Sequence, residues 1–262
     1  MPNCSVLALW TGLKEPLAFG TGRLELFRSG TPRASRNPLL VIVPGGSYRV
    51  LAPQDCTPVA ELLCEHGYHA AVLYYRVKPH AFPNAVADLS RALRLMRKNA
   101  AMFSIDPDRI GVVGFSAGGH LAGLSAFAPH LHRDADDDLV DTVSPRPDRL
   151  SLVYPVVRLA LKSHHRSAQN FFGAAQPGPE TTRGFDLDFL VEPGAPPFQL
   201  THAVDDPIVP ISPSLALLDR AAHIGVEVQA NILPSGGHGF VVRPGVAGTT
   251  WPGPLLDWFE SL

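Results

Sequence analysis

The sequence predicts a single α/β domain with a mostly parallel central sheet and helices on both faces. Three observations lead to this prediction. The 262 residues, 45% hydrophobic and 18% charged, suit one large domain with a sizeable core. Short apolar runs alternate with amphipathic segments along most of the chain. The 23 glycines and 26 prolines suit tight loops between regular elements rather than disorder.

Short apolar runs predict the strands. Residues 39–43 are apolar throughout, as expected of a strand that is covered on both faces. Residues 23–28 alternate in polarity instead, which indicates a half-buried edge strand. Strands are expected at residues 23–28, 39–43, 70–75, 110–113, 150–154, 198–204 and 226–233.

The segments between these runs predict helices. After the loop of residues 79–83, apolar side chains recur every three or four positions, and basic side chains on the other face are expected to face water. An earlier helix is framed by Thr57 as N-cap, Pro58 at the first helical position and Gly67 after its end. The apolar stripe is Val86, Leu89, Leu93 and Met96, and the basic residues are Arg91, Arg94, Arg97 and Lys98. Further helices are expected at residues 117–127, 212–225 and 255–262.

Residues 158–195 lack a clear periodic pattern and are expected to be irregular, with one short helix. A stretch of this length inside a compact domain is typical of a cap or an insertion on the substrate side. We therefore expect residues 1–262 to form one domain, with a small cap at about residues 158–195.

Composition excludes several classes of protein. The formal net charge of -2 gives no reason to expect nucleic acid or an anionic membrane as a partner. No apolar run approaches the roughly 18 residues that a membrane-spanning helix needs, and residues 1–14 lack the pattern of a secretory signal. Three cysteines make no disulfide framework, and no ligand spacing predicts a metal site. We expect a cytoplasmic protein without metal or cofactor that is compatible with a homo-oligomer.

One motif predicts a nucleophile. An apolar run at residues 110–113 leads into Gly114-Phe115-Ser116-Ala117-Gly118, and small and apolar residues follow. A buried strand that turns sharply into a helix, with serine at the apex, has this pattern. Its two glycines leave room for the strained turn beside the neighbouring strand and helix. The pentapeptide also occurs by accident in unrelated chains. It therefore indicates a nucleophile only if other loops supply the partners that such a serine needs.

A serine nucleophile needs a base, a group that orients the base, and donors for the oxyanion. In parallel sheets such groups collect in loops at the carboxyl ends of strands. His238 stands among three glycines in the loop after the last strand. His120 is the rival, but its spacing of four residues puts it one helical turn from Ser116, beside or beneath it. We expect His238 to be the base and His120 to have a packing or supporting role.

Two adjacent carboxylates compete to orient the base. Asp205 and Asp206 follow the strand at residues 198–204. Asp206 is favoured because the turn at Pro207 fixes its position and the apolar pair after the proline anchors the loop. Asp205 remains the alternative.

The loop after residues 39–43 is the candidate oxyanion hole. It reads Pro44-Gly45-Gly46-Ser47-Tyr48, and its glycines let backbone N–H groups approach a ligand closely. The N–H of Ala117 and that of Gly46 or Ser47 would form the pair of donors. Tyr48 and Phe115 flank this site in the sequence and are candidates for contact with the substrate.

With these residues in place, the chain resembles the α/β-hydrolases, closest to the acetyl-xylan-esterase-like and feruloyl-esterase-like group of the esterase/lipase superfamily. The resemblance implies an α/β-hydrolase fold and a catalytic triad of Ser116, Asp206 and His238. Pro44 and Ser47 depart from the hormone-sensitive-lipase branch, which has His and a third Gly there, and this argues against a lipase for bulky esters. The matching stretches are residues 43–48, 75–77, 83–97, 106–122, 203–210 and 236–240.

The resemblance implies a serine carboxylesterase for short acyl esters, including acetyl esters of sugars or xylan, with a small-molecule ester as its partner. Ser116 argues against a dienelactone hydrolase, which has a similar fold but uses a cysteine. A peptidase or amidase with the same triad is the nearest alternative. A non-catalytic binding protein on the same scaffold is the other, although all three triad members are present in order.

Overall fold

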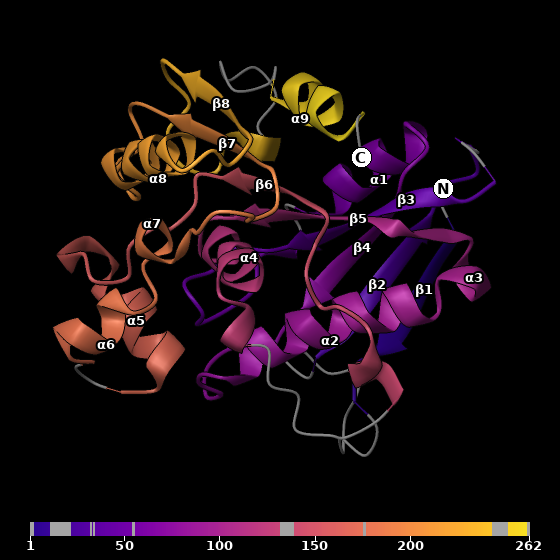
Figure 1. Cartoon of the computed structure of the whole chain (residues 1–262), viewed down its shortest axis with the longest axis horizontal. Helices are drawn as coiled ribbons and strands as arrows, with labels where there is room; N and C mark the ends of the chain where they lie inside the picture. The colour runs from indigo at the N-terminus through magenta and orange to yellow at the C-terminus, as the bar shows by residue number, and fades with distance from the viewer. Residues whose placement is uncertain are drawn as a thin grey trace.

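The predicted, mostly parallel sheet is present in the computed structural model, which describes residues 3–10, 22–31, 33, 35–53, 56–131, 139–174, 177–242 and 251–260. The order of the strands is β1-β2-β4-β3-β5-β6-β7-β8 (Figure 1). β2 pairs antiparallel with both β1 and β4, and the pairs from β4 to β8 are parallel. The strands are β1 (Asn3–Ala8), β2 (Arg23–Arg28), β3 (Asn37–Val43), β4 (His69–Tyr74), β5 (Ile105–Phe115), β6 (Arg149–Val153), β7 (Phe198–Ala203) and β8 (Val228–Leu233).

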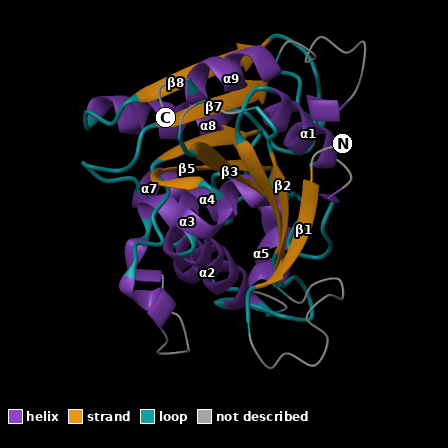
Figure 2. Ribbon diagram, turned by 90° about the vertical axis from the view of Figure 1, so that its right-hand side faces the viewer, coloured by secondary structure: helices purple, strands orange, loops and turns teal. Residues whose placement is uncertain are grey.

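Helices cover both faces of the sheet, which confirms the predicted fold class. In β3, Val41 packs toward α2 and α4, whereas Ile42 packs toward α1 and α9. Successive side chains of a strand point to opposite faces, so a fully apolar run is what a doubly covered strand requires. Figure 2 shows α1 and α9 on the other side of the sheet from α2 and α4. The helices are α1 (Thr57–Glu65), α2 (Asn84–Lys98), α3 (Ala100–Phe103), α4 (Ala117–Phe127), α5 (His165–Phe172), α6 (Pro179–Arg183), α7 (Leu187–Leu190), α8 (Ser212–His223) and α9 (Pro252–Phe259).

Two predictions for the N-terminal half of the chain are wrong: the position of β2 in the sheet and the N-cap of α1. β2 is not an edge strand, because β1 pairs with its outer side, and Leu24 and Leu26 are fully buried. The N-cap of α1 is Cys56 rather than Thr57, and no side chain caps this helix. Pro58 still lies in the first turn, where its missing N–H costs nothing.

The basic face of α2 is only partly in water, contrary to the prediction. Arg91 is 4% exposed, and its Nε donates to the carbonyl of Leu9 at 3.1 Å. Arg94 is also buried and donates to the carbonyl of Val143 at 3.0 Å. Chain segments far from α2 in sequence cover this face, and a guanidinium can be buried when carbonyls satisfy its N–H groups.

Residues 158–195 contain more helix than predicted. A short 3₁₀ helix (Lys162–His164) leads into α5, and α6 and α7 follow. Figure 1 shows α5, α6 and α7 together at one side of the molecule, next to α4. Phe171 and Leu187 are buried in the same apolar cluster as β3 and α4. This segment therefore shares the main core of the domain.

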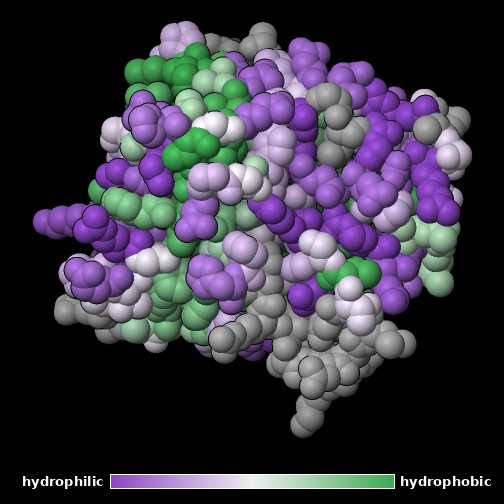
Figure 3. Space-filling view, in the orientation of Figure 1, coloured by the Kyte–Doolittle hydropathy of each residue, from purple (hydrophilic) through white to green (hydrophobic). Residues whose placement is uncertain are grey.

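On the face of the molecule that Figure 3 shows, apolar residues are unevenly distributed. Figure 3 shows apolar atoms gathered over the β7–β8 end of the sheet. Large exposed apolar side chains in this part of the chain include Val204, Leu215 and Ile232. Within the described ranges, no helix is both long and apolar enough to cross a membrane.

Candidate active site

Ser116 occupies the turn between β5 and α4, as the motif predicts. Its backbone has φ 53° and ψ -117°, a strained conformation that non-glycine residues rarely adopt. The N–H of Ser116 donates to the carbonyl of Val153 at the end of β6, which anchors the turn. A Cβ added to Gly118 would collide with the carbonyl oxygen of Val43. The second glycine of the motif is thus required where α4 begins against β3.

A chain of two hydrogen bonds connects Ser116, His238 and Asp206. Nε2 of His238 lies 3.1 Å from Oγ of Ser116, and Nδ1 lies 2.7 Å from Oδ2 of Asp206. A carboxylate can only accept a hydrogen bond, so Nδ1 carries the ring proton. In the neutral ring Nε2 is then the acceptor for the serine hydroxyl. The structure thus brings together three residues that the sequence places 122 and 32 positions apart.

Asp206 is held in one orientation by its own loop. Its Oδ1 accepts hydrogen bonds from the N–H groups of Ile208 and Val209, both at 2.9 Å, so Oδ2 is left for His238. Burial by itself raises the pKa of this carboxyl. Hydrogen bonds from two histidines, His202 and His238, and from the Val209 amide outweigh burial and hold the pKa well below its ordinary value. Asp206 is therefore ionised and able to stabilise a positive charge on the ring.

Asp205, the alternative acid, contacts a different part of the site. Its Oδ1 accepts hydrogen bonds from the N–H groups of Gly236 and Gly237 at 2.9 and 2.8 Å. These glycines immediately precede His238. The two adjacent carboxylates thus have different roles. Asp206 contacts the ring of His238, and Asp205 stabilises the loop that carries His238.

His120 lies beneath the turn and is fully buried. Its Nε2 lies 2.8 Å from the carbonyl oxygen of Phe185, and its Nδ1 lies 2.7 Å from the hydroxyl of Tyr48. A carbonyl only accepts, so Nε2–H donates to it and Nδ1 accepts from Tyr48. Burial lowers the pKa of His120 to about 4, although the Phe185 carbonyl works in the opposite direction. The ring is therefore neutral and fully engaged in structural hydrogen bonds.

The pH dependence of stability tests this description of His120. Its pKa falls from 6.5 in the unfolded chain to about 4 in the folded one, so its contribution is complete above pH 6.5 and lost as the pH falls toward 4. Between pH 7.5 and 5 this amounts to about 2 kcal/mol. Urea unfolding should show that the stability deficit of His120→Gln shrinks by about that amount at pH 5. A deficit that is independent of pH would contradict the buried neutral ring.

Tyr48 does not line the cavity next to Ser116, contrary to the expectation that it contacts the substrate. Its ring is 2% exposed and packs against Phe171, with the centroids 4.8 Å apart, and its hydroxyl is bound to His120. The neighbouring Tyr75 donates to the carbonyl of Pro44 at 2.9 Å. Both tyrosines thus support the candidate oxyanion loop from the core side. Phe115 does line the cavity.

The candidate oxyanion loop is shaped by unusual backbone angles. Gly46 has φ 129°, and a Cβ there would collide with the carbonyl of Val50, so only glycine fits. Ser47 follows with φ 54°. Gly46 and Ser47 line the same cavity as Ser116. Ala117 is the first residue of α4, where a backbone N–H has no acceptor within the helix.

The cavity beside Ser116 has a volume of about 410 Å³ and two kinds of wall. Tyr154 lies on one side, its ring centroid 4.6 Å from that of His238. Tyr154 was not among the residues predicted for the site, although its position directly after β6 could have indicated it. The apolar wall is Phe115, Tyr154, Val156, Ile208 and Val209, and the polar wall, from the 3₁₀ helix and α5, is Ser163, His164, Arg166 and Ser167.

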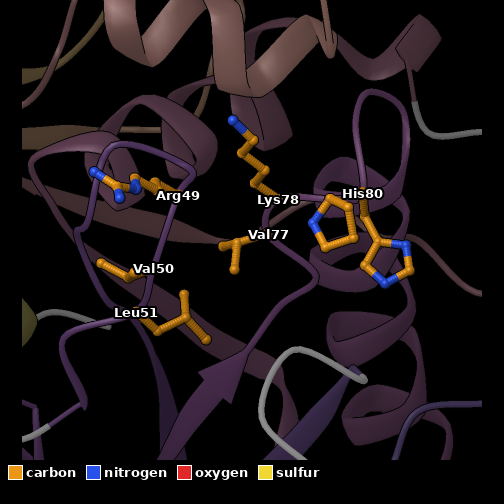
Figure 4. Close-up of a pocket in the computed structure, with 7 residues that line it drawn as sticks. Arg49, Val50, Leu51, Val77, Lys78 and His80 are labelled. Atoms are coloured by element: carbon orange, nitrogen blue, oxygen red, sulfur yellow. The ribbon is translucent and has the colours of Figure 1, made fainter.

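A second cavity, of about 490 Å³, lies beyond the candidate oxyanion loop (Figure 4). Arg49, Val50 and Leu51, which continue that loop, form one side of it. Residues 77–80 form the other. Among the described residues, no three His, Cys, Asp or Glu side chains are grouped so that they could hold a metal ion.

Comparison with known proteins agrees with this architecture. The model of the family described as BD-FAE matches residues 27–220. An acetylxylan esterase from Xylanibacter ruminicola is 30% identical over 210 residues, which is 77% of this chain and 40% of that protein. Endo-1,4-beta-xylanase B from Butyrivibrio fibrisolvens is 29% identical over 220 residues, which is 82% of this chain and 34% of that protein. The chain thus spans well under two thirds of the length of either relative.

Solved structures show the same fold. The acetyl ester-xyloside bifunctional hydrolase from Caldicellulosiruptor lactoaceticus has a TM-score of 0.86 and 34% identity, with 99% of this chain and 97% of that chain covered. A thermophilic esterase from Thermogutta terrifontis has a TM-score of 0.82, with 100% of this chain and 92% of that chain covered. Its 22% identity supports the fold alone. The fold predicted from the resemblance to α/β-hydrolases is confirmed.

Proposed function

The chain belongs to the BD-FAE family, and on that premise we propose that it is a serine carboxylesterase that hydrolyses short-chain acyl esters through an acyl-enzyme. The observation that carries the proposal is the pair of hydrogen bonds from Ser116 Oγ to His238 Nε2 and from His238 Nδ1 to Asp206 Oδ2. Relatives named for acetylxylan and for an acetyl ester-xyloside suggest acetyl esters of sugars as substrates.

In the proposed reaction, Oγ of Ser116 attacks the ester carbonyl while Nε2 of His238 takes the hydroxyl proton. The ionised Asp206 stabilises the imidazolium through Nδ1–H. His238 then gives the proton to the departing alcohol, which leaves an acyl group on Ser116. Water attacks this acyl group with His238 again as base, and release of the acid restores the serine.

Backbone N–H groups would stabilise the oxyanion at both tetrahedral stages. The donors that we propose are Ala117 and either Gly46 or Ser47, which all belong to the elements that meet at Ser116. Such donors are already oriented before the reaction and require no reorganisation as charge develops. The strained turn at Ser116 and the fixed angles at Gly46 supply this rigidity.

The volume of the cavity predicts a preference for short acyl groups. About 410 Å³ must hold the acyl and alcohol portions together, and long chains would have to extend out of it. With p-nitrophenyl esters we expect kcat/KM to be highest for acetate to butyrate and at least about tenfold lower for octanoate, as in other sites limited by pocket size. Equal or better rates on octanoate would contradict this assignment. Faster hydrolysis of an aminoacyl p-nitroanilide than of p-nitrophenyl acetate would favour an amidase instead.

Cytoplasmic location and a small-molecule partner are part of the same proposal. Cys4, Cys56 and Cys64 are all free thiols, a usage typical of reducing compartments. For a homo-oligomer, the surface to test would be the β7–β8 end of the sheet, where Ile232 is exposed.

A further inference from the structure

His202 is a buried histidine next to the carboxylate of Asp206, and the proposed reaction does not use it. It belongs to β7, lies four residues before Asp206 and is fully buried. Its Nε2 lies 3.0 Å from the carbonyl oxygen of Val209 and 3.4 Å from Oδ2 of Asp206. A carbonyl can only accept a hydrogen bond, so Nε2 carries a proton, and the carboxylate lies beside this N–H group.

The other ring nitrogen binds His202 to a helix. Its Nδ1 lies 2.9 Å from Oγ of Ser214, a fully buried residue in the first turn of α8. A serine hydroxyl can donate or accept, so it satisfies Nδ1 whether or not that nitrogen carries a proton. The ring is thus held by β7 and α8, and it presents Nε2–H to residues 204–211, the loop that joins these two elements.

The loop that carries Asp206 has few apolar anchors of its own. The side chains of Val204 and Ile208 are 56% and 60% exposed, whereas Val209 is buried. Exposed side chains do little to hold a loop in one conformation, so its polar contacts matter more. Val209 makes two of these contacts: its N–H donates to Oδ1 of Asp206, and its carbonyl accepts from His202. His202 therefore fixes the residue that in turn fixes the carboxylate.

His202 also favours the ionised form of Asp206. Burial raises the pKa of this carboxyl, and of the contacts that lower the pKa, the one from His202 is the strongest, ahead of the one from His238. Oδ1 faces two backbone amides, and Oδ2 faces the two histidine rings. The carboxylate is therefore held at both of its oxygens while His238 gains and loses its proton.

We propose that His202 is a positioning residue that acts through Asp206: its Nε2–H holds the carboxylate and the adjoining loop in the place from which Oδ2 orients His238. This inference rests on the proposed esterase function and adds a further residue to it. Because His202 is not among the residues that line the cavity beside Ser116, its loss should slow the chemical step without weakening substrate binding. Misplacement of a catalytic group by about 1 Å can cost roughly 10²-fold in rate.

Two amide substitutions separate the two sides of the ring. The side chain of His202→Gln brings an NH₂ group near the position of Nε2 and loses the contact with Ser214. The shorter side chain of His202→Asn reaches only to the position of Nδ1, so it keeps a partner for Ser214 and loses the contacts with the loop. Each variant removes one side of the same buried ring, and a purely structural role of His202 predicts similar losses from both.

With p-nitrophenyl acetate, His202→Asn should lower kcat by about 10- to 100-fold, with KM within about threefold of the wild type. His202→Gln should stay within about fivefold of the wild type in kcat, because it retains the donor. Ser151→Ala is the matched control: it removes a buried hydrogen bond to Gln199 of β7, which is not a member of the triad, and should leave kcat and KM unchanged. Urea unfolding of each variant establishes that it is folded under the assay conditions.

A measurement on the unaltered protein makes the test independent of how well the variants fold. Long-range ¹H–¹⁵N NMR spectra show which ring nitrogens of each histidine carry protons. At a pH where His238 is neutral, its proton should be on Nδ1, whereas His202 should have a protonated Nε2. An unprotonated Nε2 in His202 would overturn the proposal, because the donor toward Asp206 would be absent.

The kinetic outcomes are also distinct. Equal losses of kcat in His202→Asn and His202→Gln, an unchanged kcat in His202→Asn, or a loss confined to KM would overturn the role of His202 and leave the esterase assignment intact. A wild-type protein that does not hydrolyse p-nitrophenyl acetate would overturn the proposed function, and this inference with it.

Discussion

Asp206→Asn should lower kcat on p-nitrophenyl acetate by about 10³- to 10⁴-fold while the fold is preserved. Oδ1 of Asp206 accepts two backbone N–H groups, from Ile208 and Val209. An asparagine will therefore keep its amide oxygen at that position and point its NH₂ group at Nδ1 of His238. Nδ1 must then accept, which leaves the proton on Nε2, where it blocks removal of the proton from Ser116.

The matched control is the same substitution one residue earlier. Asp205 only accepts hydrogen bonds from the N–H groups of Gly236 and Gly237, and an asparagine oxygen can do the same. Asp205→Asn should therefore stay within about tenfold of the wild type, because a neutral acceptor still holds the loop. Steady-state kinetics of Asp205→Asn and Asp206→Asn show which of the two carboxylates orients His238. A larger loss in Asp205→Asn than in Asp206→Asn would reverse the roles of the two carboxylates.

The fold could be predicted from the sequence because its signals are local. A fully apolar run such as residues 39–43 has few alternatives to a strand covered on both faces, and β3 includes it. The turn at Ser116 was also predictable, since only small residues fit where α4 packs against β3.

The features that could not be predicted depend on contacts between distant segments. From its position on α2, Arg91 is expected to face water, yet its Nε donates to the carbonyl of Leu9, 82 positions away in the chain. The sequence favours Asp206 as the partner of His238, but it gives no sign that Asp205 holds the two glycines just before that histidine.

The polar wall of the cavity could not be predicted for a different reason. His164 lies in a stretch without periodicity, and the sequence says nothing about which of its side chains would face Ser116.

Ser116→Ala should reduce kcat by about 10⁵- to 10⁶-fold, since the nucleophile itself is removed and only background catalysis by the rest of the site remains. Alanine tolerates the backbone of Ser116 no worse than serine does, so the fold should persist. Ser163→Ala is the matched control, because this exposed serine lines the same cavity without belonging to the chain of hydrogen bonds. Its activity on p-nitrophenyl acetate should stay within about twofold of the wild type.

Covalent labelling tests the nucleophile most directly. A fluorophosphonate loses fluoride to an activated serine and forms an Oγ–phosphorus bond, so the protein gains the mass of one phosphonyl group. Intact-mass spectrometry followed by peptide mapping should place a single adduct on Ser116 in the wild type and in Ser163→Ala, and none in Ser116→Ala. An unlabelled wild type, or an adduct on a serine other than Ser116, would contradict the assignment of Ser116 as the nucleophile.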